Sequence, residues 1–191
     1  MKVLVVGSGG REHAVIRKLA ENPEIDRIFC APGNGGMAQL AQCVDIKATD
    51  VAAMVDFARR EGIDFVCVTP DDPLAAGMVD AMEAAGIAAF GPSQAAAQIE
   101  ASKVFSKRLM QKYGIPTARC EVFDDAEAAL AYVRTTPAPL VVKADGLALG
   151  KGVLICKSTR AAEEAVKHTM CDHAFGKSGD RVVLEELFND P

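Results

Sequence analysis

The sequence predicts an α/β protein in which a parallel sheet is followed by a smaller α+β unit. Up to residue 90, short runs of apolar or β-branched residues alternate with helical patterns, which is typical of βαβ units. Beyond that point the alternation stops, and a glycine loop between two apolar runs, VVKADGLALGKGV at 141–153, indicates a hairpin. Half of the 191 residues are apolar, which is enough to build a core.

The elements of the first unit follow from residue spacing. Apolar residues recur at three- and four-residue intervals in three segments, which predicts three helices. Asp50 stands where the N-cap of the second helix would lie. Right-handed crossovers place such helices on both faces of a sheet. The expected strands are 3–6, 27–30, 44–46, 65–69 and 88–90, and the expected helices are 11–21, 51–61 and 74–85.

A domain boundary is expected near residue 101, which divides the chain into 1–101 and 102–191. GPS at 91–93 breaks the earlier pattern, and helical stretches follow at 93–100 and 102–113. Gly114 and Pro116 prevent the second from continuing. The remaining elements are a strand at 118–122, a helix capped by Asp124 with Glu127 three residues on, the hairpin, a helix at 159–170 and a strand at 181–186.

Composition excludes several classes of protein. A net charge of −5 and an isoelectric point near 5.3 argue against nucleic-acid binding, which needs clustered Lys and Arg. The apolar run at the start is too short for a signal peptide, and no window approaches the roughly 18 apolar residues of a membrane span. We therefore expect a cytoplasmic protein without membrane partners.

The six cysteines predict neither a disulfide framework nor a metal site. Cys30, Cys67, Cys120 and Cys156 lie in apolar strand-like runs, as reduced core residues do. There is no CxxC pair or Cys/His cluster, so we assign no metal to these side chains.

The hairpin loop carries two lysines, Lys143 and Lys151, at its two ends. Gly146, Gly150 and Gly152 leave the turn free to adopt positive φ. A Walker A loop is excluded, because it needs four residues between its glycines, a Ser or Thr after the lysine and then a helix. Two ammonium groups beside exposed backbone N–H groups nevertheless suit a triphosphate. The alternative is an ordinary glycine-rich hairpin with surface lysines.

The first glycine turn, GSGGREH, predicts an anion site but not a dinucleotide site. Gly7 and Gly9 fit a GxGxxG pattern, but Glu12 occupies its third position, and the next strand ends in APGNGG without the acidic residue that binds a ribose. A strand, a glycine turn and a helix N-terminus suit a sugar phosphate. A tight turn without a ligand remains the alternative.

The loops at 7–13, 31–36 and 70–73 should be neighbours, because each follows a parallel strand. His13 could contact a ligand there or simply pack locally. Asp71 of TPDDPL could bind hydroxyls or an amine, or could serve only to form the turn.

Together the motifs resemble the glycinamide ribonucleotide synthetases, the ATP-grasp phosphoribosylamine–glycine ligases. These motifs are GSGGREH, APGNGG, TPDDPL, FGPS, SKVFSK, IPTA, VVKADGLALGKGV and HAFGKSGDRVVLEEL, and they span essentially the whole chain. The resemblance implies a parallel-sheet pre-ATP-grasp (Rossmann-like) domain followed by a small α+β ATP-grasp lid subdomain, with the rest of the ATP-grasp fold absent. It also implies ATP-dependent ligation of glycine to 5-phosphoribosylamine through glycyl phosphate.

The same resemblance assigns roles to residues. The residues expected at ATP are Lys103, Lys143, Gly150, Lys151, Gly152, Glu185, Glu186, Leu187 and Phe188. Those expected at the sugar-phosphate substrate are Gly9, Gly10, Arg11, His13, Asn34, Gly35, Gly36 and Asp71. From the residues alone, Lys103 could instead belong to a solvated helical face, and Arg11 could be a surface residue, although its charge opposes the dipole of the helix it begins.

The chain ends at Pro191, where the family continues with the larger half of the ATP-grasp fold. The Mg ions of the family are held there, and NDP at 189–191 departs from the acidic, glycine-containing turn expected at this point. The expectation is a fragment or truncated product with little or no activity of its own. Two alternatives stay open: another ATP-grasp enzyme, such as a carboxylase or a different purine ligase, and a non-catalytic module that binds a nucleotide or sugar phosphate.

Overall fold

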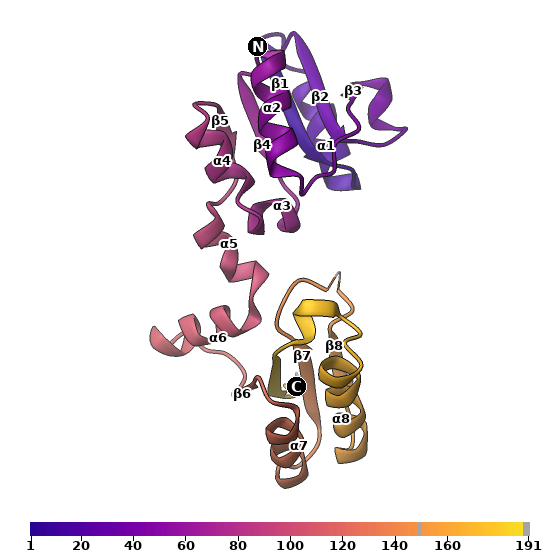
Figure 1. Cartoon of the computed structure of the whole chain (residues 1–191), viewed down its shortest axis with the longest axis vertical. Coiled ribbons are helices and arrows are strands. Elements are labelled where there is room, and N and C mark those ends of the chain that lie inside the picture. The colour runs from indigo at the N-terminus through magenta and orange to yellow at the C-terminus, as the bar shows by residue number, and fades with distance from the viewer. Residues whose placement is uncertain (149, 189–191) are drawn as a thin grey trace. The chain divides into compact units, whose positions relative to one another are not determined.

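The computed structural model describes residues 1–148 and 150–188 and divides the chain into two compact units, Met1–Ala97 and Gln98–Pro191 (Figure 1). The fold is α/β, with a parallel sheet in the first unit and an antiparallel sheet in the second. Within the described ranges, no helix combines the length and the apolar character that a bilayer crossing requires.

The first unit is built on a five-stranded sheet in the order β3-β2-β1-β4-β5, and every neighbouring pair is parallel. The strands are β1 (Lys2–Gly7), β2 (Arg27–Pro32), β3 (Gln42–Cys43), β4 (Phe65–Val68) and β5 (Ala88–Phe90). The order changes direction between β1 and β4, which makes the loops at the carboxyl ends of these strands the natural ligand site. The predicted parallel sheet is confirmed.

Helices pack on both faces of this sheet. On one face α1 (Gly10–Leu19) contributes Ile16, and the short 3₁₀ turn η1 (Met37–Gln39) contributes Met37. The other face is covered by α2 (Val51–Glu61) and α4 (Met78–Ala84). Asp50 caps α2 as predicted, since its carboxylate accepts a hydrogen bond of 3.1 Å from the N–H of Ala53.

Two elements differ from the prediction. The third strand lies at Gln42–Cys43 rather than at 44–46, because the pairing with β2 places Cys43 opposite Cys30, and only Val44 N–H continues the ladder, to Cys30 O at 2.8 Å. The single helix expected at 74–85 is two helices, α3 (Asp71–Ala75) and α4. They are separated at Gly77, whose φ of +85° lies outside the helical region.

The second unit contains a four-stranded antiparallel sheet in the order β6-β9-β7-β8. Its strands are β6 (Cys120–Phe123), β7 (Leu140–Ala144), β8 (Val153–Cys156) and β9 (Val182–Glu186). Two further helices, α5 (Gln94–Ala101) and α6 (Lys103–Lys112), precede the sheet in the chain.

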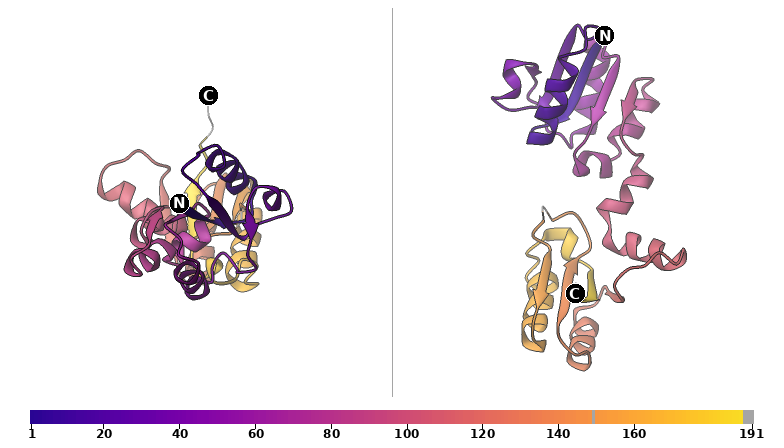
Figure 2. Two further views of the ribbon diagram at one scale, coloured as in Figure 1. Left: turned by 90° about the horizontal axis from the view of Figure 1, so that it is seen from above. Right: turned by 180° about the vertical axis from the view of Figure 1, so that it is seen from behind.

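Helices cover one face of this sheet, and the other face holds two of the candidate site residues. α7 (Ala126–Thr135) and α8 (Thr159–Val166) pack against Leu140, Val142 and Leu184, and Figure 2 shows these helices beside the strands. Because alternate strand residues point to opposite faces, Lys143 and Glu185 lie on the side away from α7 and α8.

The helix expected at 159–170 is α8 followed by a π-helical turn at Lys167–Cys171, and a 3₁₀ turn, η3 (Gly176–Gly179), leads into β9. The six cysteines have free thiols. Cys30, Cys67 and Cys156 are buried as predicted, whereas Cys120 is half-buried.

The cap of α7 is Asp125, not Asp124 with Glu127. Asp125 has an extended backbone (φ −122°, ψ 127°), and its Oδ1 accepts from the N–H of Ala128 at 2.8 Å. Replacing Asp125 with alanine should therefore lower the free energy of unfolding by about 1 kcal/mol, while Asp124→Ala should change it by less than about 0.5 kcal/mol. Urea unfolding followed by circular dichroism measures both. Equal effects of the two variants would contradict the assignment.

Candidate functional site

The first glycine turn is organised by Glu12, whose side chain is buried under it. One carboxylate oxygen accepts from Gly9 N–H at 2.8 Å, and the other accepts from Thr69 Oγ1 at 2.6 Å and Arg11 Nε at 3.0 Å. Burial raises the pKa of this carboxyl, but the hydrogen bonds from Thr69, Arg11 and Gly9 outweigh it, so the pKa lies below its ordinary value. Glu12 occupies the position where a dinucleotide fingerprint has its third glycine. The hydrogen bonds that Glu12 makes with Gly9, Arg11 and Thr69 explain why this position is not a glycine.

The three predicted loops do come together at the carboxyl ends of β1, β2 and β4. Gly33 N–H donates to Gly7 O at 3.1 Å, and Asn34 Nδ2 donates to Ser8 O at 2.8 Å. A Cβ added at Gly36 would lie 2.8 Å from the His13 ring, so this histidine packs against the second loop. The third loop joins through the bond between Thr69 and Glu12.

A cavity of about 510 Å³ opens beside these loops. Arg11 supplies its cation, and Thr69 a hydroxyl, while Val68, Leu74, Ala89, Phe90, Gly91 and Pro92 complete the lining. The Arg11 side chain is 58% exposed, so it can turn toward an anion. Gly9, Gly10 and Gly35 are exposed in the adjoining turns, and Asp71 is exposed at the start of α3. The first two loops are therefore in direct contact with each other, whereas Asp71 lies at the edge of the three loops.

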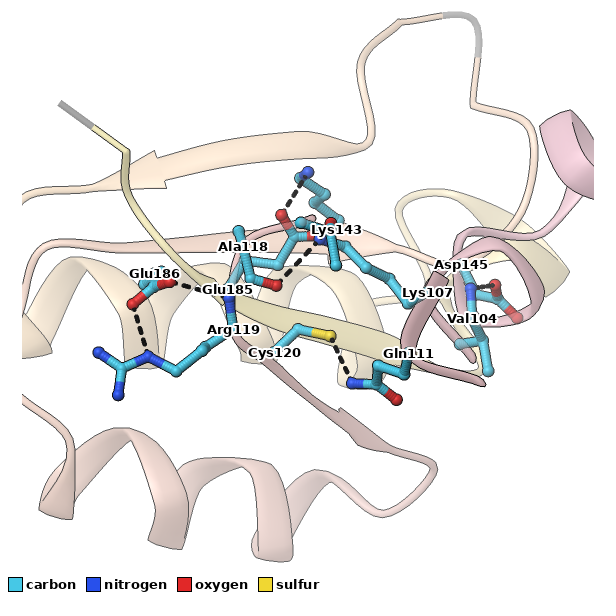
Figure 3. Close-up of polar contacts among 11 residues, drawn as sticks. Val104, Lys107, Gln111, Ala118, Arg119, Cys120, Lys143, Asp145, Glu185 and Glu186 are labelled. Atoms are coloured by element: carbon cyan, nitrogen blue, oxygen red, sulfur yellow. Dashed lines mark hydrogen bonds and ion pairs between the residues drawn. The ribbon is translucent and has the colours of Figure 1, made fainter. Parts of the chain in front are cut away.

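In the second unit, two lysines meet on one buried carboxylate (Figure 3). Glu185, with a side chain only 5% exposed, lies 2.7 Å from Lys143 Nζ through Oε2 and 3.2 Å from Lys107 Nζ through Oε1. Lys107 is anchored further by Thr117 Oγ1 at 2.7 Å and Ala118 O at 3.3 Å. Lys107 was not among the predicted residues, although its place four residues after Lys103 put both on one helical face.

The two oxygens of Glu185 are not equivalent. Oε2 accepts a hydrogen bond from Lys143, but Lys107 approaches Oε1 outside hydrogen-bond geometry, so Oε1 is a buried acceptor without a hydrogen bond. The Glu185 side chain is therefore held by one hydrogen bond, from Lys143, and one ion pair, with Lys107.

Lys103 begins α6 and is half-buried beside this cluster. Its Nζ donates to Gly146 O at 3.0 Å, and its N–H donates to Asp145 O at 3.0 Å. Burial lowers the pKa of the Lys103 ammonium below its ordinary value, and the charge of Lys143 acts in the same direction, while Asp145, Glu100 and Glu185 oppose it. Lys103 and Lys143 thus both lie at the start of the glycine loop, where two ammonium groups suit an anion.

Asp145 holds Lys103 in place. Its Oδ1 accepts from Ser102 Oγ at 2.8 Å and from Val104 N–H at 2.8 Å, and its Oδ2 is paired with Arg181. Asp145 thus ties the N-terminus of α6 to the end of β7 and to the segment that enters β9. Asp145 was given no role from the sequence.

The glycines of the lysine loop have two kinds of role. Gly150 has the predicted positive φ, at +77°. Gly146 and Gly152 permit close approach instead: a Cβ would collide with Ser178 at the first and would lie 2.8 Å from Ala148 Cβ at the second. Lys151 is exposed, and within the described residues no contact joins its side chain to Lys143, so its role at a shared anion stays a prediction.

The two carboxylates at the end of β9, Glu185 and Glu186, have different partners. Glu186 binds Arg119 at both its N–H (2.9 Å) and its Nε (3.0 Å), and these bonds hold the pKa of the Glu186 carboxyl below its ordinary value. Glu185 alone faces the lysines, as Figure 3 shows. Leu187 is half-buried and Phe188 is 67% exposed, so an apolar side chain is available next to Glu186.

The residues present fit a polyphosphate better than they fit a metal ion. Lysine ammoniums suit the charged phosphates of a nucleotide. Over residues 1–148 and 150–188, no group of three or more His, Cys, Asp or Glu side chains is placed to hold a metal. We therefore assign magnesium no ligand in this part of the chain.

Comparison with known proteins gives one consistent result. Residues 1–100 match the phosphoribosylglycinamide synthetase N domain, and residues 101–190 match the ATP-grasp (A) domain of the same family. The chain is 51% identical over 189 residues to the phosphoribosylamine–glycine ligase of Allochromatium vinosum, covering 98% of this chain and 44% of that protein. It is 49% identical over 191 residues to the Vibrio cholerae enzyme, again covering 44% of the relative.

Solved structures agree. The phosphoribosylamine–glycine ligase of Thermotoga maritima superposes with a TM-score of 0.75 at 28% identity, covering all of this chain and 45% of that one. A biotin carboxylase from Campylobacter jejuni reaches 0.78 at 18% identity, with 46% of its chain covered, which shows a shared fold alone. The chain spans less than half the length of these relatives, and by its two matched domains it belongs to the phosphoribosylglycinamide synthetase family.

Proposed function

We propose that this chain forms the sugar-phosphate site and part of the ATP site of a phosphoribosylamine–glycine ligase. The reaction joins glycine to 5-phosphoribosylamine through glycyl phosphate and releases ADP and phosphate, as a step of de novo purine biosynthesis. In this proposal residues 1–101 are the pre-ATP-grasp substrate domain, and residues 102–191 are the linker helix and the first, lid part of the ATP-grasp domain.

The observation that carries the proposal is that Lys103 and Lys143, from separate elements, both lie at the start of the glycine loop: Lys103 Nζ donates to Gly146 O at 3.0 Å, and Lys143 is in β7, the strand that leads into the loop. A triphosphate between them would neutralise both ammoniums. As the bond to the γ-phosphate breaks and negative charge develops on the ADP leaving group, fixed cations would stabilise the transition state without reorganising. Gly150, Lys151 and Gly152 would cover the phosphates from the loop.

The base of the nucleotide would lie along the open face of the sheet. Glu185 would face the nucleotide through Lys143, with which its Oε2 is paired at 2.7 Å. Glu186, Leu187 and Phe188 would complete this site through backbone groups and apolar contact. Exposed Val153 and Ile155 on β8 add further apolar surface to the same face.

The sugar phosphate would bind in the first unit. Helix α1 begins at Gly10 directly after the glycine turn, and helix N-termini attract anions. Gly9, Gly10 and Arg11 would hold the phosphate, while Asn34, Gly35, Gly36 and Asp71 would surround the sugar. His13, packed against Gly36, would position that loop.

Calorimetric titration with ATP and with ribose 5-phosphate tests both sites at once. Lys103→Met should weaken ATP binding by about tenfold or more and leave ribose 5-phosphate binding unchanged, because a charge-assisted bond is worth about 1.5–3 kcal/mol. Arg11→Met should have the reverse effect. If neither ligand binds the parent chain, or if each variant weakens both ligands equally, the two-site proposal is wrong.

Two other functions remain as candidates. A non-catalytic nucleotide and sugar-phosphate module would bind both ligands, yet its complete protein would show no ligase activity. Another ATP-grasp ligase, as the shared fold with biotin carboxylase allows, would release phosphate from ATP with an acid other than glycine. Glycine-dependent phosphate release by the complete protein favours our proposal over both. We expect the 191 residues alone to bind without turnover, because the relatives' remaining length is expected to hold the magnesium ligands.

A further inference from the structure

Two cysteines of the first unit lie in contact next to the second substrate loop. Cys30 on β2 and Cys43 on β3 are register partners on neighbouring parallel strands, and their sulfur atoms are 3.4 Å apart. Cys30 is fully buried, whereas Cys43 is exposed. We propose that Cys30 and Cys43 form a thiol-modification site, at which a low-molecular-weight disulfide oxidises the pair to a reversible disulfide.

The strand geometry permits this bond. Register partners on adjacent strands are separated by roughly 4.8 Å, which falls within the Cα separation of disulfides, about 4.4–6.8 Å. Both side chains leave the sheet on the same face, because their sulfurs are already in contact. The sulfurs must approach from 3.4 Å to about 2.0 Å, a movement that the two-residue edge strand β3 can make.

The chemistry follows from the different exposure of the two thiols. The Cys43 thiolate attacks one sulfur of the small disulfide and releases one small thiol, leaving a mixed disulfide on Cys43. The Cys30 thiolate then attacks Cys43 Sγ, forms the protein disulfide and releases the second small thiol. The two cysteines lose two electrons and two protons, which the small disulfide takes up.

The second step should be slow at neutral pH. Burial, together with the hydrogen bond to Cys43, raises the pKa of the Cys30 thiol to about 12, and only the thiolate is a nucleophile. The reaction is therefore best followed at mildly alkaline pH over long incubation.

The disulfide would change the loop that carries Asn34. A Cβ at Gly33 would lie 2.6 Å from Cys30 Sγ and 2.7 Å from Cys43 Sγ, so the loop backbone rests directly on both sulfurs. Cys43 Sγ also lies 3.6 Å from Asn34 O. Disulfide formation draws Cys43 toward Cys30 and so moves the sulfur atoms on which the loop backbone rests. Asn34 then moves with this loop. The effect on a sugar phosphate rests on the proposed function; the disulfide itself does not.

Oxidised glutathione and peptide mass mapping test the site. In the parent chain we expect Cys30 and Cys43 to be linked, with the loss of two hydrogen atoms, and dithiothreitol should restore both thiols. Cys30→Ser should keep glutathione on Cys43. Cys43→Ser should leave Cys30 unmodified, and the matched control Cys171→Ser, which removes the other exposed cysteine, should link as the parent does.

Glutathione retained on Cys43 as the final product in the parent, a link to Cys171, or two unreacted thiols would each overturn the proposal. Titration with ribose 5-phosphate then measures the consequence, and oxidised chain should bind several-fold more weakly than reduced chain. If reduced chain does not bind ribose 5-phosphate, the proposed function fails, while the mass map still decides the modification site.

Discussion

Replacing Lys107 with methionine should lower the free energy of unfolding by about 3 kcal/mol, at the lower end of the range for breaking a buried ion pair. The reason is Glu185, which would keep its charge in a site where its side chain is 5% exposed and would retain only Lys143 as a partner. Thr117 and Ala118 would lose their donor as well. Urea unfolding followed by circular dichroism measures the change.

The matched control is Arg108→Met, one position along the same helix. The Arg108 side chain is exposed and makes no hydrogen bond or ion pair within the described part of the chain, so its loss should cost less than about 0.5 kcal/mol. The double variant Lys107→Met with Glu185→Met removes both buried charges and should recover much of the loss, since the penalty belongs to the buried carboxylate left with Lys143 alone. If Lys107→Met unfolds like Arg108→Met, or if the double variant is less stable than Lys107→Met alone, the ion pair does not have this role.

Replacing Lys143 with methionine in the complete ligase should reduce turnover by about 10²- to 10³-fold, the range for losing one preorganised electrostatic contact to the transition state. This prediction rests on the proposed function. The Lys143 side chain is 26% exposed, and its charge helps to lower the pKa of Lys103. The Lys143 ammonium can therefore turn away from Glu185 and contact a phosphate. Steady-state kinetics should show a fall in kcat as well as a rise in KM for ATP.

Two further variants separate this effect from a change of fold. Lys157→Met removes an exposed lysine just beyond β8 and should leave turnover near that of the parent. Lys143→Arg keeps the charge but replaces a compact ammonium with a planar group, so it should restore part of the ATP affinity and less of the turnover. Parent-like turnover by Lys143→Met, with ATP affinity unchanged, would remove Lys143 from the site.

The lysines were recognisable because their signals are local. Lys143 ends an apolar run before a glycine loop, and Lys103 follows a serine that caps a helix. Lys107 carried the same helical signal, but its partner Glu185 is distant in sequence, and nothing nearby indicates that this carboxylate is buried. Asp145 was missed for a similar reason, since its three partners come from α6 and from the segment before β9.

The choice between neighbouring residues was also beyond the sequence. Asp124 and Asp125 are chemically equivalent caps, and the backbone of α7 selects Asp125 because α7 begins at Ala126. Likewise, residues 44–46 resemble a strand, but the register with β2 pairs Gln42 and Cys43 with Phe29 and Cys30. Register depends on a partner strand that local pattern does not specify.

By itself the sequence determined the α/β class, the parallel sheet, the placement of most helices and the family, because periodicity, glycine turns and motif order are properties of neighbouring residues. Only the tertiary structure decided that Glu185 lies buried between Lys107 and Lys143, that Asp145 fixes the start of α6, and that Cys30 touches Cys43. These contacts join residues that are far apart in the chain. Their distances and burial, and therefore their energies, arise only when the strands pair and pack.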